Sequence, residues 1–129
     1  RAEEQTAQTA KEFQQLFERN NDALFLHRLT DHNEPGPFIE VNGVACKRLG
    51  YSREELLEMT PTDIDASEKA FDRSRIMQEI IDNGETTFDM RHVAKDGTVI
   101  PVEVTSHLME FRRENVVLSA ARDISVRKQ

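Results

Sequence analysis

The first stretch of the chain has the hydrophobic pattern of an amphipathic helix. Residues 2–20 contain no Gly or Pro, and four apolar residues recur at three- and four-residue steps: Ala10, Phe13, Leu16 and Phe17. This spacing predicts one apolar stripe on an otherwise polar helix. Because the stripe lies only in the last turns, we expect the helix to extend outward. It then either packs on its own domain or forms a dimer.

The next stretch predicts a hairpin followed by short helices. Apolar runs at 24–29 and 38–41 flank the turn-forming residues 31–37, which is the pattern of two paired strands. Asn42 then provides a cap for a helix, and Gly50 provides its usual C-terminal stop.

Capping residues also mark the later helices. Ser52 and Glu55 form a capping box at the start of another short helix. A longer helix is predicted over 67–82, with Met77 and Ile81 on one face.

After this helix the hydrophobic period changes from near four to two, which predicts strands. Alternate residues of two such runs are apolar or aromatic: Phe88, Met90 and His92, then Ile100, Val102 and Val104. A two-residue Asp-Gly loop would mix the faces of these strands, whereas a three-residue turn with a left-handed Gly97 sets Phe88 and Met90 opposite valines. We therefore predict the three-residue turn, a polar break at 112–115 and a last strand at 116–124.

The order of these elements predicts the fold class. Antiparallel hairpins at both ends, with helices between them, indicate an α+β domain whose helices pack on one face of the sheet. The chain has 129 residues, enough for one domain and too few for two substantial ones. We expect a flanking helix over 1–20 and a single domain over 21–128.

Charge and cysteine content narrow the classes of function. The net charge is −7, from 24 acidic and 17 basic side chains, which disfavours a protein that binds nucleic-acid duplexes. The single Cys46 forms no internal disulfide, and no Cys/His spacing fits zinc, so we expect no metal site and a cytoplasmic location. No apolar run reaches the roughly 18 residues of a membrane span. Since the chain starts at Arg1, we expect a segment of a longer protein, which could itself be membrane-anchored.

Three segments of the sequence resemble a PAS domain, and the resemblance covers nearly everything from Asp22 to Lys128. The first is the run from Phe38 to Leu56, which contains Asn42-Gly43 and Leu49-Gly50-Tyr51-Ser52. The second is Lys95-Asp96-Gly97 within a run that ends Pro101-Val102-Glu103-Val104. The third, Asp123-Ile124-Ser125, is similar to the closing Asp-Ile-Thr motif of the family, with serine in place of threonine.

The resemblance implies a five-stranded antiparallel sheet of order 2-1-5-4-3 that cups the helices. It also implies a sensory or interaction module in a multidomain bacterial signalling protein, attached to an effector such as a histidine kinase or a diguanylate cyclase. Such modules commonly form homodimers through the helix before the first strand, here Phe13, Leu16 and Phe17. Their signal leaves through the end of the last strand, here Asp123, Ile124 and Ser125.

A ligand pocket is expected between the inner face of the sheet and the helix at 67–82. Its candidate lining residues are Met77, Ile81, Phe88, Met90, His92, Val102, Val104 and Ser106. This lining suits a small, mostly apolar ligand or a fully packed core. Haem is not expected because the helix at 67–82 has no histidine, although His92 and His107 remain possible ligands. Flavin is not expected because the neighbours of Cys46 do not match the photoreactive motif and the chain has no Trp.

The sequence shows no catalytic constellation, since it lacks a Gly-rich phosphate loop and a nucleophile elbow. Two functions of different classes remain. The first is a sensor that controls an attached effector through a change at its helices. The second is a ligand-free protein–protein interaction or dimerisation module.

Overall fold

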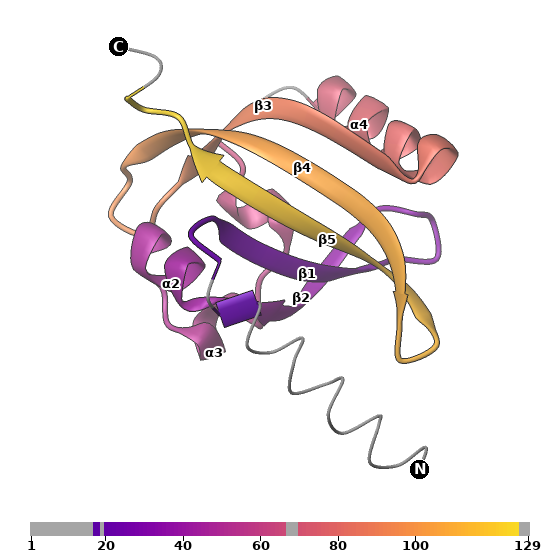
Figure 1. Ribbon diagram of the computed structural model, residues 1–129, viewed down its shortest axis with the longest axis horizontal. Coiled ribbons are helices and arrows are strands. Elements are labelled where there is room, and N and C mark those ends of the chain that lie inside the picture. The colour runs from indigo at the N-terminus through magenta and orange to yellow at the C-terminus, as the bar shows by residue number, and fades with distance from the viewer. Residues whose placement is uncertain (1–16, 19, 67–69, 127–129) are drawn as a thin grey trace.

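The computed structural model describes residues 17, 18, 20–66 and 70–126 of the chain. Its elements are β1 (Ala23–Leu29), β2 (Pro35–Val41), α2 (Gly43–Leu49), α3 (Arg53–Leu56), the 3-10 helix η1 (Pro61–Ile64), α4 (Ala70–Asn83), β3 (Glu85–Val93), β4 (Val99–Phe111) and β5 (Glu114–Asp123). In this part of the chain the strands form one five-stranded antiparallel sheet in the order β2-β1-β5-β4-β3 (Figure 1). The predicted α+β fold and its strand order are confirmed.

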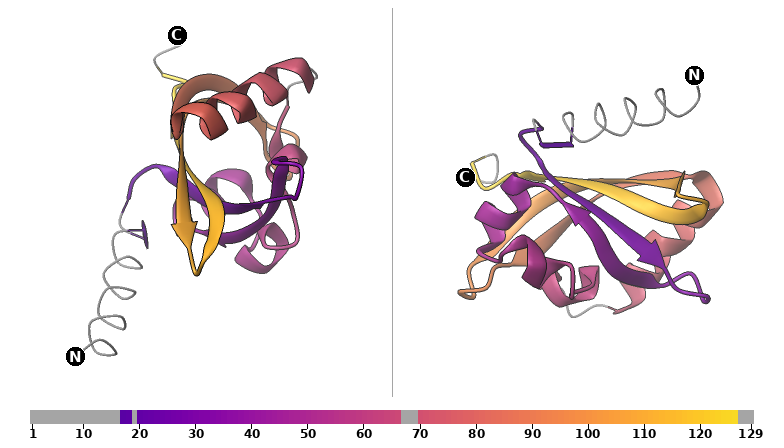
Figure 2. Two further views of the ribbon diagram at one scale, coloured as in Figure 1. Left: turned by 90° about the vertical axis from the view of Figure 1, so that its right-hand side faces the viewer. Right: turned by 90° about the horizontal axis from the view of Figure 1, so that it is seen from below.

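The helices α2, α3, η1 and α4 lie on one face of the sheet, as the two views in Figure 2 show. On this face, α2 contacts β1, whereas α4 contacts β3, the strand at the opposite edge of the sheet from β2. Buried apolar side chains of the inner face and of α2 and α3 form the core, including Phe25, Val41, Leu49, Leu56 and Val102. The helices are therefore divided between two ends of the inner face, and α4 stands opposite the strands that carry the predicted pocket residues.

The β3–β4 hairpin determines which side chains of these strands face the helices. Phe88 pairs with Val104 across the strands, so apolar residues meet on the inner face. The N–H of Ala94 donates to the carbonyl oxygen of Thr98 at 2.8 Å, which leaves three residues in the turn. Gly97 has a φ of +91°, a conformation that L side chains rarely adopt. The predicted three-residue turn is confirmed.

Asn42 caps α2, as predicted, and its side chain also forms hydrogen bonds with the backbone of the segment before β1. Its Oδ1 accepts hydrogen bonds from the backbone N–H groups of Leu24 and Ala45, both at 3.0 Å. Its Nδ2 donates to the carbonyl oxygens of Phe17 at 3.1 Å and Asp22 at 2.9 Å. Because this side chain is fully buried, the four bonds join α2, β1 and the preceding segment at one point.

The other local signals have mixed outcomes. Gly50 ends α2 in the left-handed conformation, and Ser52 with Glu55 forms the predicted capping box of α3. The predicted helix start at Ser67 lies outside the described residues, as does nearly all of the expected flanking helix over 1–20.

Two connections differ from the sequence-based expectation. Residues 31–37 are predicted as a loop, yet β2 already begins at Pro35. This strand lies at the edge of the sheet, where a residue without an N–H is tolerated. The break predicted at 112–115 is shorter, since β5 begins at Glu114. Arg112 and Arg113 have φ of +51° and +69°, the two-residue turn geometry that suits twisted antiparallel strands.

Candidate functional site

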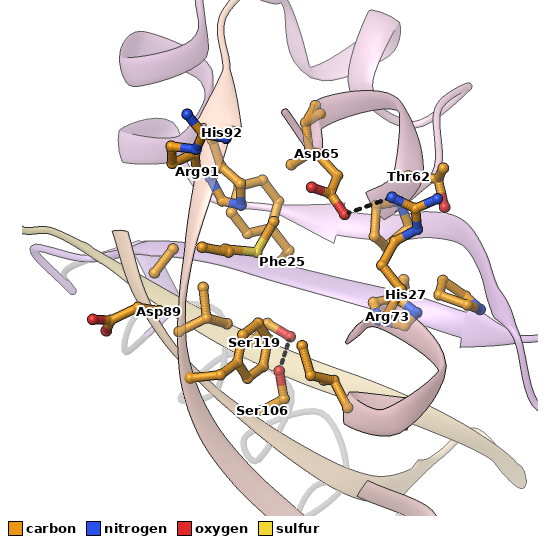
Figure 3. Close-up of a pocket in the computed structure, with 18 of the residues that line it drawn as sticks. Phe25, His27, Thr62, Asp65, Arg73, Asp89, Arg91, His92, Ser106 and Ser119 are labelled. Atoms are coloured by element: carbon orange, nitrogen blue, oxygen red, sulfur yellow. Dashed lines mark hydrogen bonds and ion pairs between the residues drawn. The ribbon is translucent and has the colours of Figure 1, made fainter. Parts of the chain in front are cut away.

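A cavity of about 630 Å³ lies between the inner face of the sheet and α4 (Figure 3). Residues of all five strands, of η1 and of α4 line it. Its apolar walls include Phe25, Phe38, Ile64, Ile76, Met77, Ile80, Phe88, Met90 and Val104. This volume is typical of small-molecule sites, which span roughly 300–1,000 Å³.

The structure brings together six of the eight predicted pocket residues, namely Met77, Phe88, Met90, His92, Val104 and Ser106. Val102 is not among the lining residues, because it is 0% exposed within the core cluster. Ile81 is corrected to Ile80, which is 2% exposed and lines the cavity. The packing of α4 on the sheet turns the helix so that Ile76 and Ile80, one turn apart, lie on the cavity side.

Two serines meet on the wall that β4 and β5 form. Ser106 and Ser119 pair across these strands, and their Oγ atoms lie 2.7 Å apart. Because each hydroxyl has one donor and two lone pairs, one O–H group and further lone pairs remain for another partner. Ser119 was not identified from the sequence, since its place beside Ser106 depends on the register between strands.

His92 is the deepest titratable group at the cavity. It is 4% exposed, and its Nδ1 atom is buried with no hydrogen-bond partner among the described residues. Its ring meets the ring of Phe25 edge-on at 5.7 Å between centroids. Burial, and to a smaller extent the positive charge of Arg48, lowers the pKa of His92 to about 4. The imidazole is therefore neutral at pH 7.

His27 is a second buried imidazole at the cavity, and sequence analysis missed it. Its Nδ1 lies 2.8 Å from the carbonyl oxygen of Arg28, and its ring lies edge-on to Phe38. Burial lowers the pKa of His27, partly offset by the hydrogen bond to Arg28. The signal was the two-residue step from Phe25, which places His27 on the same face of β1.

An ion pair lies at the rim of the cavity. Asp65, which follows η1, is 3.5 Å from Arg73 of α4, and the Asp65 side chain is almost fully covered. Asp65 also bridges to His92 through the backbone, which holds η1 against β3. The neighbouring side chains Asp89 and Arg91 are exposed, and Asp89 points away from the cavity in Figure 3.

The end of β5 connects the cavity to the C-terminal segment. Ile124 is 3% exposed and lines the cavity, and its N–H donates to the carbonyl oxygen of Pro101 at 3.0 Å. Oδ1 of Asp123 accepts from the Ser125 hydroxyl at 2.6 Å and from the Ser125 N–H at 2.9 Å. These hydrogen bonds lower the pKa of Asp123.

Of the three residues predicted to form a dimer contact, the structure describes only Phe17. Phe17 is 2% exposed within its own chain, so it is not available as a contact with a partner. Phe13 and Leu16 lie outside the described residues.

The remaining candidates do not reach the cavity. His107 lies on the outer face of β4, half-exposed, with its Nδ1 3.2 Å from Glu85. Burial raises the pKa of the Cys46 thiol, which disfavours its reactive thiolate. Among the described residues, no cluster of three or more His, Cys, Asp or Glu has metal-binding geometry.

Within residues 17–66 and 70–126, apart from residue 19, no helix is both long and apolar enough to cross a bilayer.

Comparisons with known proteins agree with this architecture. The family model for the PAS domain matches residues 21–126. The methyl sulfide methyltransferase-associated sensor of Methanosarcina acetivorans is 35% identical over 119 residues, which is 91% of this chain and 11% of that protein. The chain thus spans a small part of the length of this relative.

Solved structures share the fold. The PAS domain of an HTR-like protein from Haloarcula marismortui has a TM-score of 0.77 and 24% identity, covering 95% of this chain and 98% of that one. A PAS domain from a two-component sensor histidine kinase has a TM-score of 0.72 and 25% identity, covering 92% and 98%. With a family model that matches most of its length and a sheet and helices arranged as in these structures, the chain belongs to the PAS domain family.

Proposed function

We propose that this PAS module senses a small molecule held in the cavity and relays its binding to an attached effector enzyme. A histidine kinase or a diguanylate cyclase is the effector that we expect. The name of the Methanosarcina relative, a sensor, supports the sensory role. A cytoplasmic location of the module is part of this proposal.

One observation carries the proposal: Ile124 belongs to both the cavity and the C-terminal exit. Its side chain lines the cavity, and it lies in the chain between Asp123 and Ser125, which are hydrogen-bonded to each other. A ligand that touches Ile124 therefore pushes directly on the first residues after β5.

The chemistry at the exit suits a change between two arrangements. The Asp123 carboxylate is a strong acceptor at the surface, and the bond that it accepts from the Ser125 hydroxyl is short, at 2.6 Å. Because the site is exposed to water, the carboxylate can exchange these donors for others at little cost. A small displacement of Ile124 can thus alter how the chain leaves the sheet.

Filling the cavity from α4 tests the relay without a known ligand. Met77→Trp adds volume inside the cavity, and Val99→Trp adds the same ring at a half-exposed site that does not line it. We expect hydrogen exchange at the Ile124 and Ser125 amides to change in the Met77 variant and to match wild type in the Val99 variant. Unchanged exchange in both variants would contradict the relay.

The second candidate function is a ligand-free interaction or dimerisation module. Native mass spectrometry of the purified chain separates the two functions, because a sensor with an open cavity retains a small molecule or accepts one on titration. A protein that is empty and stays empty across a small-molecule library supports the interaction module.

Dimerisation through the N-terminal stripe is a separate part of the proposal. We expect Phe13→Glu combined with Leu16→Glu to convert a dimer into a monomer in sedimentation velocity. Gln15→Glu, which adds charge off the apolar stripe, serves as the control. Phe17 is left intact because it is buried within its own chain. A dimer that survives the double substitution would remove this stripe from the interface.

A further inference from the structure

We propose that the cavity takes a neutral aromatic compound that carries a hydrogen-bond donor, such as a phenol or a ring N–H, and that it rejects ionised ligands. This inference rests on the proposed function, because it names the chemical class that the same cavity would sense. The walls, the charges and the free lone pairs of the cavity each support it.

The walls of the cavity suit flat rings. Phe25, Phe38 and Phe88 approach it from three different strands, and Phe25 and Phe38 already lie 5.3 Å apart between centroids. Met77 and Met90 line it as well, and thioether sulfur makes favourable contacts with aromatic rings. Aromatic pairs gain energy beyond the area that they bury, so a ring is the favoured occupant of such walls.

The charges around the cavity do not provide a counter-ion for a charged ligand. Asp65 and Arg73 are paired with each other at the rim. Asp89 and Arg91 also border the cavity, but they alternate along β3 with the inward-facing residues and are exposed to water. The polar groups farther in are hydroxyls and imidazoles. An ionised ligand would lose its hydration here without gaining an opposite charge, which is strongly unfavourable. The net charge of −7 adds to the barrier against anions.

The imidazoles provide lone pairs rather than charge. The Arg28 carbonyl can only accept, so Nδ1 of His27 carries the proton and its Nε2 is left as an acceptor. His92 has an Nδ1 with no partner among the described residues, although the side chain is more than nine-tenths buried. Buried polar atoms are normally hydrogen-bonded, so the ring that His92 contributes to the lining carries an unsatisfied polar group. Burial holds the pKa of both histidines below the usual value, which keeps the rings uncharged.

The serine pair adds a further polar point on β4 and β5, which lie in the sheet between the strands of the two histidines. Ser106 and Ser119 satisfy one donor between them and leave one hydroxyl hydrogen and further lone pairs. A ligand with a donor, and optionally one acceptor, can therefore be matched by an imidazole or by the serine pair while its ring contacts phenylalanine and methionine.

A matched naphthalene series tests the class on the 129-residue chain. The probes are 2-naphthol, naphthalene, 2-naphthoate and 2-naphthylmethylammonium, which share one ring system and differ in donor and charge. By isothermal titration near neutral pH, we expect 2-naphthol to bind about tenfold more tightly than naphthalene, the effect of one hydrogen bond. We expect both ions to bind more weakly than naphthalene.

The outcomes separate this inference from the proposed function. Binding of 2-naphthoate or the ammonium as tight as that of 2-naphthol overturns the inference and leaves the sensory cavity intact. Equal binding of naphthol and naphthalene overturns the role of the hydrogen bond. Failure of all four probes to bind overturns the inference, whereas the proposed function is tested separately by the exchange experiment on Met77→Trp and by native mass spectrometry with a small-molecule library.

Variants assign the preference to the histidines. His92→Phe keeps an aromatic ring beside Phe25 and should reduce the naphthol preference while naphthalene still binds. His107→Phe is the matched control on the outer face of the same sheet and should keep the preference. If His92→Phe does not fold, His27→Phe and Ser119→Ala provide the same comparison. A preference that persists in every folded variant overturns the assignment.

Discussion

The guanidinium group of Arg48 in α2 donates a hydrogen bond of 2.7 Å to the carbonyl oxygen of Ala121 in β5. The same charge reaches two titratable groups. It adds to the effect of burial in lowering the pKa of His92, and to that of the Ser125 hydrogen bonds in lowering the pKa of Asp123. One side chain therefore links α2 to β5 and acts on one titratable group at the cavity and on one at the C-terminal exit.

Replacing this arginine should be visible at the cavity. In Arg48→Met we expect the pKa of His92 to rise but to stay below 6.5, since burial is the larger cause. Loss of the bond to Ala121 should also lower the free energy of unfolding by about 1–2 kcal/mol. NMR titration of the His92 ring and urea denaturation measure the two effects. Arg48→Lys keeps the charge and should leave the pKa of His92 near its wild-type value; an unshifted pKa in Arg48→Met would exclude the charge effect.

Asn42 should be one of the most sensitive polar positions. Asn42→Ala leaves backbone groups at Leu24, Ala45, Phe17 and Asp22 without their partner. We expect a loss of about 3 kcal/mol in the free energy of unfolding, because buried unpaired groups are costly.

Chemical denaturation measures this loss. Asn20→Ala is the control, since Asn20 makes one exposed hydrogen bond to the backbone of Asp22. The control should change stability by less than about 1 kcal/mol. A similarly small loss for Asn42→Ala would show that the buried network is dispensable.

Met90 tests the assignment of the sheet faces. Met90→Ala should cost about 2 kcal/mol, the low end for such a truncation, because the side chain is half-buried and already borders a cavity. Arg91→Ala, the exposed neighbour on the other face, should change stability by no more than about 0.5 kcal/mol. Thermal or urea unfolding compares the two. Similar costs for both substitutions would mean that the inner face has been misassigned.

His92 makes the stability of the domain depend on pH. Its pKa is about 4 in the folded chain, against an ordinary value of 6.5. Between these values the unfolded chain binds a proton that the folded chain does not, so stability falls as the pH drops from 6.5 toward 4. The loss approaches about 3 kcal/mol. The lowered pKa of His27 acts in the same direction.

Urea unfolding between about pH 7.5 and about pH 4.5 measures this dependence. The free energy of unfolding should depend less steeply on pH in His92→Phe than in wild type. Because both proteins have the same carboxylates, the contribution of these groups cancels when the two slopes are subtracted. His107→Phe, which removes an exposed histidine, should follow wild type more closely. Equal slopes for wild type and His92→Phe would refute the role of His92.

Gly97 should be sensitive through its backbone alone. A Cβ at this position would meet no atom within 4 Å, yet φ is +91°. Gly97→Ala should therefore cost about 1 kcal/mol. Gly43→Ala, where φ is ordinary and the added Cβ makes a normal contact, should be close to neutral. Thermal unfolding of both variants checks the difference, and an equally neutral Gly97→Ala would argue against a left-handed turn.

Much of the fold was predictable because its signals are local. The alternation around Phe88 and Val104 identified the inner face, and counting residues through the turn to Gly97 gave the register. Capping by Asn42 and by Ser52 likewise depends on neighbours within a few residues.

The parts that could not be predicted depend on distant partners. Ser119 meets Ser106 only because β5 pairs with β4 in one register, and His27 reaches the cavity only because β1 lies beside β5. The choice of Ile80 over Ile81 depends on how α4 rotates when it packs on β3, which a helical pattern in a short sequence leaves open.

The proline pair at the start of β2 has a consequence for behaviour at high concentration. β2 is an edge strand whose Phe38 N–H is already bonded to the carbonyl oxygen of Met59 at 3.0 Å, and Pro35 and Pro37 have no N–H to offer a strand from another molecule. A strand from another molecule that paired with this edge would bury some of its own carbonyl groups without an N–H donor from β2. Growth of the sheet from molecule to molecule, the route to fibrils, is therefore disfavoured at this edge.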